Sequence, residues 1–171
     1  MVEVVGVGAT QASPAPSVFV IPAQAGIQVH DRHPNKLDNM TDKTIVQLAV
    51  FETAARRVYD ALMDSRQHAA FTGDKAMIDA RVGGSFTAYG GYITGIFLEI
   101  EPGKKIIQSW RASDWPEGAW SKVTIELQDI RGAATLRFTQ EGVPEQFAEE
   151  IAQGWHDFYW DKLREYLEAK A

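Results

Sequence analysis

The chain contains no cysteine, so neither a disulfide framework nor a thiolate zinc site can form in it. It also lacks any unbroken apolar run of the roughly 18 residues that a helix needs to cross a bilayer. Basic residues are fewer than acidic ones, 17 against 23, and the net charge is −6. That sign argues against a nucleic-acid partner, because binding a phosphate backbone needs clustered Lys and Arg. We therefore expect no nucleic-acid partner, no membrane span and, from the missing cysteine, a cytoplasmic location.

Side chains typical of catalysis and metal binding are also few. His68 and His156 fall on expected helices, where exposure to solvent is the simpler interpretation. Glu149 and Glu150 have the spacing of a solvated helix face rather than that of an acid–base pair. The sequence therefore predicts no catalytic group, no metal site and no cofactor.

Composition changes near residue 40. Residues 1–39 hold four of the seven prolines and few apolar residues at regular spacing. Within them, SVFVIPAQAGIQ is similar to a peptide encoded by dispersed bacterial repeat elements, and Met40 opens MTDKTIVQLAVF. Two interpretations follow: residues 1–39 are a disordered extension, or natural translation starts at Met40. In both, residues 40–171 form one domain.

Strands and short helices open this domain. TIVQLAVF (44–51) alternates and is rich enough in β-branched residues to predict a strand. Residues 53–72 predict a helical section with Thr53 as N-cap, a break near Ser65 and an end at Gly73; its apolar face carries Val58, Leu62 and Phe71. Turn residues then separate six expected strands at about 75–81, 85–90, 92–101, 104–112, 119–129 and 133–140.

The last element, 145–170, predicts a long helix with an aromatic stripe. Residues at helical spacing form this stripe: Phe147, Ile151, Trp155, Phe158, Tyr159, Leu163 and Tyr166. Such a stripe needs a broad apolar surface, which the inward positions of two expected strands supply: Val123, Ile125, Leu127, Ala134, Leu136 and Phe138. The predicted fold class is α+β, in the order strand, two short helices, six-strand antiparallel meander and a long C-terminal helix packed on the curved sheet.

Three tryptophans, Trp110, Trp115 and Trp120, lie within the stretch QSWRASDWPEGAW. Trp-Pro-Glu-Gly (115–118) is a turn between two strands, so the three indoles gather at one end of a hairpin. They either cover the open end of the sheet or, at Trp115 and Trp120, bind a partner together with Glu117.

Two further residues of the last helix are open to interpretation. Lys162 lies within about 20° of Trp155 on a helical wheel, inside the apolar stripe. It either extends to the helix edge or points its ammonium into a cavity as an anchor for an acidic ligand. Gly154 either permits close packing on the sheet or leaves room for a ligand beside Trp155.

The order of elements, with GGSF, GIFLEIEPGKKIIQSWR, WPEG, VTIEL, GVP and GWHDFYWDKL, resembles the START-like (SRPBCC) helix-grip superfamily. Within it, residues 44–170 are similar to the family homologous to the C-terminal domain of the activator of heat-shock protein 90 ATPase. The resemblance implies a cavity between helix and sheet, which elsewhere in the superfamily holds lipids, sterols, hormones or polyketides. The eukaryotic activator also has a separate N-terminal domain that contributes to chaperone binding, and residues 1–43 do not show its pattern.

Three functions remain open at this point. The leading hypothesis is a non-enzymatic module that binds a small hydrophobic or amphipathic ligand, with Phe97, Trp110, Trp155, Tyr159 and Lys162 as ligand-binding residues. A cavity of about 300 Å³ or more would support it. The second is a partner protein of a heat-shock 90 chaperone, supported by a flat apolar patch around the Trp-Pro-Glu-Gly turn. The third, a cyclase or hydratase-type enzyme, needs polar groups that converge inside the cavity.

Overall fold

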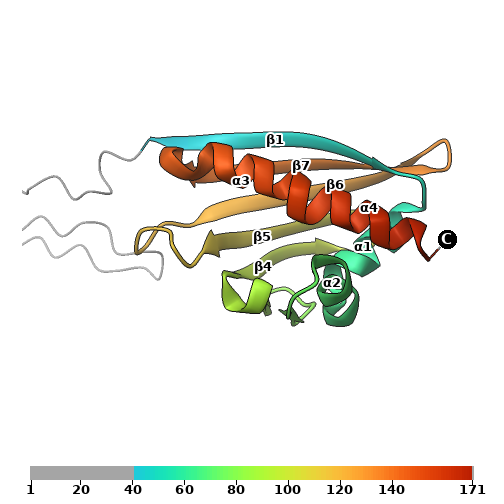
Figure 1. The fold of residues 1–171 in the computed structure, drawn as a ribbon, viewed down its shortest axis with the longest axis horizontal. Helices are drawn as coiled ribbons and strands as arrows, with labels where there is room; N and C mark the ends of the chain where they lie inside the picture. Colours follow the sequence, from blue (N-terminus) through green and yellow to red (C-terminus); the bar gives the residue numbers. More distant parts are fainter. Residues whose placement is uncertain (1–40, 171) are drawn as a thin grey trace, which may run out of the picture. The chain divides into compact units, whose positions relative to one another are not determined.

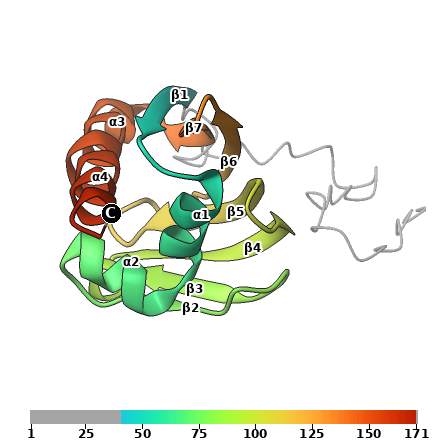
Figure 2. The ribbon, with the colours of Figure 1, turned by 90° about the vertical axis from the view of Figure 1, so that its right-hand side faces the viewer.

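The computed structural model describes residues 41–170, and the expectations for residues 1–39 lie outside this range. In the described part, a seven-stranded antiparallel sheet has the order β1-β7-β6-β5-β4-β3-β2. The sheet curves around the long C-terminal helix, and α1 (Ala55–Met63) and α2 (Ser65–Thr72) pack between the two near one end (Figures 1 and 2). The predicted α+β helix-grip fold is confirmed.

The strands follow the expected order with adjusted ends. Their bounds are β1 (Asp42–Phe51), β2 (Met77–Ile78), β3 (Ser85–Ala88), β4 (Ile93–Glu101), β5 (Lys105–Ala112), β6 (Ser121–Ile130) and β7 (Ala133–Pro144). The strand expected over 75–81 is only two residues long because the chain turns after it. The Arg81 N–H donates to the Asp79 carbonyl, and the Gly84 N–H donates to the Arg81 carbonyl. β7 is longer than expected because its end pairs with the start of β1.

The concave face of the sheet supplies the surface that the helix needs. The six inward residues expected on β6 and β7 are all buried. Between β4 and β3, the ring of Phe86 occupies the space that a Cβ on Gly95 would fill, so a glycine is required there. The alternation of apolar and polar residues along β6 and β7 thus determines which face of the sheet the helix covers.

The two short helices are held by acidic side chains. Thr53 is not the N-cap of α1; the helix begins at Ala55, and its first N–H donates to the Asp129 carboxylate at the end of β6, over 2.7 Å. The break near Ser65 is confirmed, and Asp64 accepts from the N–H groups of Arg66 and Gln67. Gly73 ends α2 with a φ of +76°, as expected for a left-handed C-cap.

The final helix is irregular where the sequence predicted a uniform one. A 3₁₀ turn (Glu145–Phe147) leads into α3 (Ala148–Gly154), a π-helical turn (Trp155–Trp160) and α4 (Asp161–Glu168). In the π-helical turn, Asp161 N–H bonds to the His156 carbonyl five residues back, so the turn holds an extra residue. Trp155 and Trp160 therefore both face the sheet, while Phe158, placed inside by the stripe, is 58% exposed.

Removing the Asp129 carboxylate tests the capping of α1. Asp129→Ala should lower the free energy of unfolding by about 1 kcal/mol, the typical value for a lost N-cap side chain. Urea denaturation of both proteins measures this difference. Gln128→Ala, a change at the exposed neighbouring position, is the control. Equal losses for the two variants would contradict a capping role for Asp129.

Candidate functional site

Trp155 lies at the centre of the contact between helix and sheet. Its indole ring is 4% exposed and packs against Phe138, with ring centroids 4.5 Å apart, and against Trp160 at 5.3 Å. Its Nε1–H donates to Oε1 of Gln140 on β7, over 2.8 Å. This hydrogen bond fixes the orientation of the indole ring, which apolar packing alone would specify only weakly.

Gln140 belongs to a chain of buried hydrogen bonds. Its side chain is fully buried, and Nε2 donates to the Ser121 hydroxyl over 2.9 Å. The Ser121 hydroxyl in turn donates to the Trp110 carbonyl over 2.9 Å. An unsatisfied buried polar group costs about 1–3 kcal/mol, so this chain stabilises the position of Trp155 relative to β5, β6 and β7.

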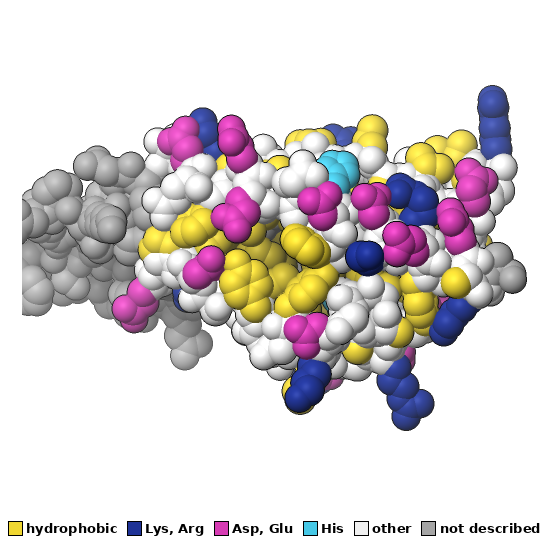
Figure 3. Space-filling view, viewed as in Figure 1, with side chains coloured by type: hydrophobic (Ala, Val, Ile, Leu, Met, Phe, Trp, Pro, Cys, Tyr) yellow, Lys and Arg dark blue, Asp and Glu magenta, His cyan; other side chains and the backbone are white. Residues whose placement is uncertain are grey.

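A pocket of about 240 Å³ opens between the final helix and the β4 side of the sheet. Its wall on the helix consists of Glu150, Ile151, Gly154, Trp155, Phe158 and Tyr159. Its opposite wall consists of Ile93 on β4 and Trp110 on β5, together with Tyr89 and Tyr92, which lie in and just after the 3₁₀ turn (Tyr89–Gly91) between β3 and β4. Apolar side chains gather on this face of the molecule, with acidic side chains beside them (Figure 3). The pocket is mostly aromatic, which is typical of small-molecule sites.

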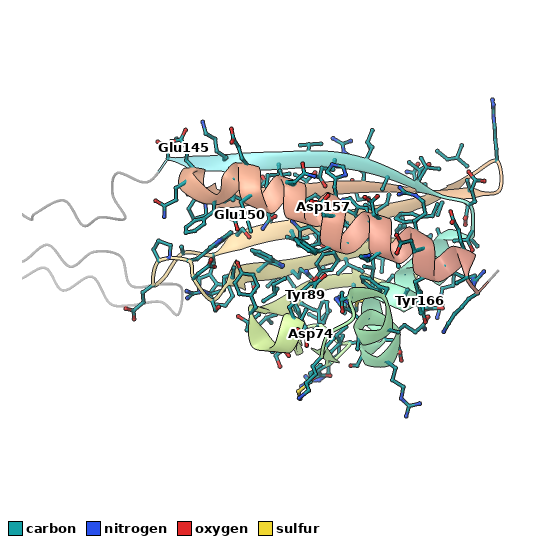
Figure 4. All side chains as sticks on the ribbon, in the orientation of Figure 1. Asp74, Tyr89, Glu145, Glu150, Asp157 and Tyr166 are labelled. Atoms are coloured by element: carbon teal, nitrogen blue, oxygen red, sulfur yellow. The ribbon has the colours of Figure 1, made fainter. Side chains whose placement is uncertain are left out.

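Two tyrosines shape the mouth of the pocket. Tyr89 has a φ of +50°, an unfavourable conformation for a bulky residue, and its hydroxyl donates to the Phe158 carbonyl over 2.7 Å. The Tyr92 hydroxyl donates to the Asp114 carboxylate over 3.2 Å. Burial raises the pKa of each tyrosine to about 12, so both stay neutral donors at physiological pH. Tyr89 and Glu150 come from opposite walls (Figure 4).

A second, smaller pocket of about 20 Å³ has room for about one water molecule. His68 lines it and is buried, so the expectation of an exposed His68 is wrong. The reason is that the imidazole finds partners inside: Nδ1 lies 3.0 Å from the Leu62 carbonyl and Nε2 lies 3.4 Å from the Tyr159 hydroxyl. Burial lowers the pKa of His68, and the bond to Leu62 opposes that shift.

The ligand-binding residues expected from the sequence are only partly brought together. Trp110, Trp155 and Tyr159 line the main pocket, while Phe97 lines the smaller one. Of the two alternatives for Lys162, the structure agrees with the helix edge and not with the cavity: its side chain is 48% exposed and its Nζ lies 3.4 Å from Glu165. The extra residue of the π-helical turn rotates Lys162 outward, while Leu163 is buried, as the stripe predicts.

The tryptophan cluster divides into a buried and an exposed part. Trp110 and Trp115 are both buried, with ring centroids 5.1 Å apart, and Trp115 stacks on Phe147. Of the two alternatives, Trp115 therefore agrees with the covering role and is not exposed to a partner, because Phe147 at the start of the final helix packs on it. Glu117 is exposed, and Trp120 is 47% exposed with the Arg111 guanidinium 5.5 Å from its ring centroid.

Sequence reasoning missed several lining residues, notably Tyr89, Tyr92, Glu150 and Phe158. Two aromatic residues around a glycine pair, Tyr-Gly-Gly-Tyr, were a usable signal, because a tight turn brings such rings to one edge. Glu150 gave no such signal, and Phe158 was expected to face the sheet with the aromatic stripe, whereas the π-helical turn places it at the pocket.

The family described as "Activator of Hsp90 ATPase homolog 1-like protein" matches residues 52–168, more than half of the chain. The chain belongs to this family. It is 30% identical over 125 residues to an "Activator of 90 kDa heat shock protein ATPase homolog" from Dictyostelium discoideum, covering 72% of this chain and 33% of that protein. It is also 30% identical over 115 residues to the human homolog 1, with coverages of 67% and 34%.

The chain thus spans about a third of the length of the curated relatives it matches. Among solved structures, an HSP90 activator from Plasmodium falciparum superposes with a TM-score of 0.69 at 24% identity, covering 73% of this chain and 96% of that one. That likeness supports the fold. In residues 41–170, no helix has the length and apolar character to cross a membrane, and His, Asp and Glu side chains form no group suited to a metal ion.

The buried imidazole predicts a pH dependence. Because its pKa is lowered on folding, the unfolded chain binds more protons, so stability should fall as pH drops below the usual histidine value of about 6.5. Denaturation at pH 7.5 and pH 5 should show a smaller loss for His68→Gln than for the parent protein. His156→Gln, at an exposed position, should behave like the parent. An unchanged pH slope in His68→Gln would contradict the prediction.

Proposed function

We propose that this domain is a non-enzymatic module that binds a small, largely apolar molecule in the pocket beneath the final helix. The observation that supports this most is the open, aromatic pocket of about 240 Å³. This volume does not reach the roughly 300 Å³ that would support such a module on volume alone, so the proposed ligand is small or extends partly into solvent. A cytoplasmic location is part of the proposal, and the absence of cysteine is compatible with it.

A buried donor on the pocket wall also favours a ligand. The indole N–H groups of Trp110 and Trp115 both lack a hydrogen-bond partner among residues 41–170, and of the two only Trp110 lines the pocket. A buried donor of this kind is uncommon in proteins and is usually satisfied by a ligand or water when protein atoms do not reach it. An acceptor atom on a bound molecule would satisfy it.

Gly154 links the pocket to the helix. A Cβ built on Gly154 would meet Phe158 Cδ2 at 3.8 Å, an ordinary contact, and its backbone is helical. Close packing on the sheet therefore does not require this glycine. Within a helix, glycine costs about 1 kcal/mol of stability relative to alanine. Because Gly154 lies on the pocket wall, we infer that the missing side chain leaves space for a ligand.

Gly154→Leu tests the proposed pocket. Leucine should fill it and weaken binding of 2-(1-naphthyl)ethanol, a neutral apolar probe, by about tenfold or more, while stability stays equal or rises. Shifts of the Trp110 and Trp155 indole N–H signals in ¹H–¹⁵N NMR spectra report binding, and Trp120 is an internal reference. Gln153→Leu, on the exposed side of the same turn, is the control. Parent-like affinity in Gly154→Leu would contradict the proposal.

Contact with a heat-shock 90 chaperone is a second candidate, favoured by the names of the curated relatives. Since Trp115 is buried, the surface near the Trp-Pro-Glu-Gly turn offers Trp120, Arg111 and Glu117 instead of a flat apolar patch. A cyclase or hydratase-type reaction has less support, because Glu150 is the one carboxylate on the pocket wall and both mouth tyrosines have partners.

Trp120→Ala tests chaperone contact. If Trp120 is a central contact, its loss should weaken binding to the heat-shock 90 chaperone of the same cell by about 30-fold, the effect of losing about 2 kcal/mol at an interface. Calorimetric titration measures the affinity, and Ile130→Ala, which truncates another exposed side chain, is the control. If the parent domain does not bind the chaperone, this candidate fails.

A further inference from the structure

The segment that covers the pocket is strongly acidic. Between Arg137 and Lys162 the chain has no Lys or Arg but has six acidic residues: Glu141, Glu145, Glu149, Glu150, Asp157 and Asp161. Glu145, Glu150 and Asp157 project along the helix in the side-chain view (Figure 4). Three of the six are paired with basic side chains, Glu141 with Lys122, Glu145 with Lys43 and Asp161 with Arg164. Among the described residues, the carboxylates of Glu149, Glu150 and Asp157 on the helix form no such pair, and Glu150 is the one that lines the pocket.

Carboxylates also stand at the mouth on the opposite wall. Asp114 accepts from the Tyr92 hydroxyl, and Asp114 and Glu150 both contribute to the raised pKa of Tyr92. The negative charge of Asp74 likewise contributes to the raised pKa of Tyr89. Among the residues that the structure describes, these three carboxylates form no ion pair with Lys or Arg. The mouth therefore carries negative charge that no basic side chain neutralises.

Aromatic rings line the interior behind this mouth. Trp155 and Tyr159 lie on the helical wall, and Trp110 lies on the wall formed by the sheet. Aromatic faces attract cations, most strongly when water is excluded, so the interior and the mouth favour the same sign of ligand charge. The pocket lining contains no Lys or Arg that would balance an anionic ligand.

We propose that the ligand is an amphipathic cation, with an apolar body between Trp155 and the sheet and an ammonium or guanidinium group beside Glu150. This inference rests on the proposed function and adds its ligand class. It replaces the acidic ligand expected from Lys162, because that side chain lies outside the pocket. A carboxylate ligand would instead meet Glu150, Asp114 and Asp74 at the mouth.

Three probes with the same ring separate charge from apolar fit: 2-(1-naphthyl)ethylamine, 2-(1-naphthyl)ethanol and 1-naphthylacetate. NMR titration at pH 7 should give the tightest binding for the amine, intermediate binding for the alcohol and the weakest for the acid. Glu150→Gln should weaken amine binding about fivefold, as expected for a partly exposed ion pair, and leave alcohol binding unchanged. Glu149→Gln removes a neighbouring charge that does not line the pocket and should have a smaller effect.

The outcomes distinguish this inference from the proposed function. If all three probes bind equally, or the acid binds best, the pocket binds apolar molecules but the cationic ligand class is wrong. Equal effects of the Glu149 and Glu150 substitutions on amine binding would also overturn a specific ion pair with Glu150. If none of the probes shifts the Trp110 and Trp155 signals, the proposed function itself fails.

Discussion

The hydrogen bond between Trp155 and Gln140 is the contact on which the helix–sheet arrangement depends. It joins the middle of the last helix to a fully buried residue of β7, and Ser121 continues the chain to the Trp110 backbone on β5. Apolar packing favours burial of the indole but specifies its direction weakly, whereas a buried donor and acceptor must meet within about 3 Å. The position of one ring therefore fixes both the helix and the edge of the pocket beside it.

The π-helical turn next to Trp155 decides which residues reach that interface. On a regular helix Lys162 would lie on the same side as Trp155, but with the extra residue in the turn it faces outward, while Leu163 stays buried. The same irregularity turns Phe158 outward to the mouth of the pocket, where its carbonyl accepts from Tyr89. The irregular turn thus keeps the Lys162 ammonium out of the pocket and places the Phe158 ring at its rim.

Sequence patterns predicted the fold well because it depends on alternation and turn chemistry. The inward residues of β6 and β7, the break before Ser65 and the end at Gly73 are all local features, and the structure confirms them. Site residues were harder to predict. Lys162 and Phe158 were placed by a uniform helical period, and His68 was judged by its residue type rather than by the partners that folding brings to it. Asp129 caps α1 from 74 residues away, a pairing that no local pattern contains.

Strain at Tyr89 connects the pocket to the energetics of the whole domain. A left-handed conformation at a bulky residue costs on the order of 1 kcal/mol or more and persists only when other contacts maintain it. Here the bond to the Phe158 carbonyl and the edge-on packing against Tyr159 supply such contacts, and both partners belong to the final helix. The helix anchored by Trp155 therefore holds the turn at the pocket mouth in place. A ligand between these walls would contact the strained turn and the anchored helix together, so its binding free energy would depend on how rigidly Trp155 holds them.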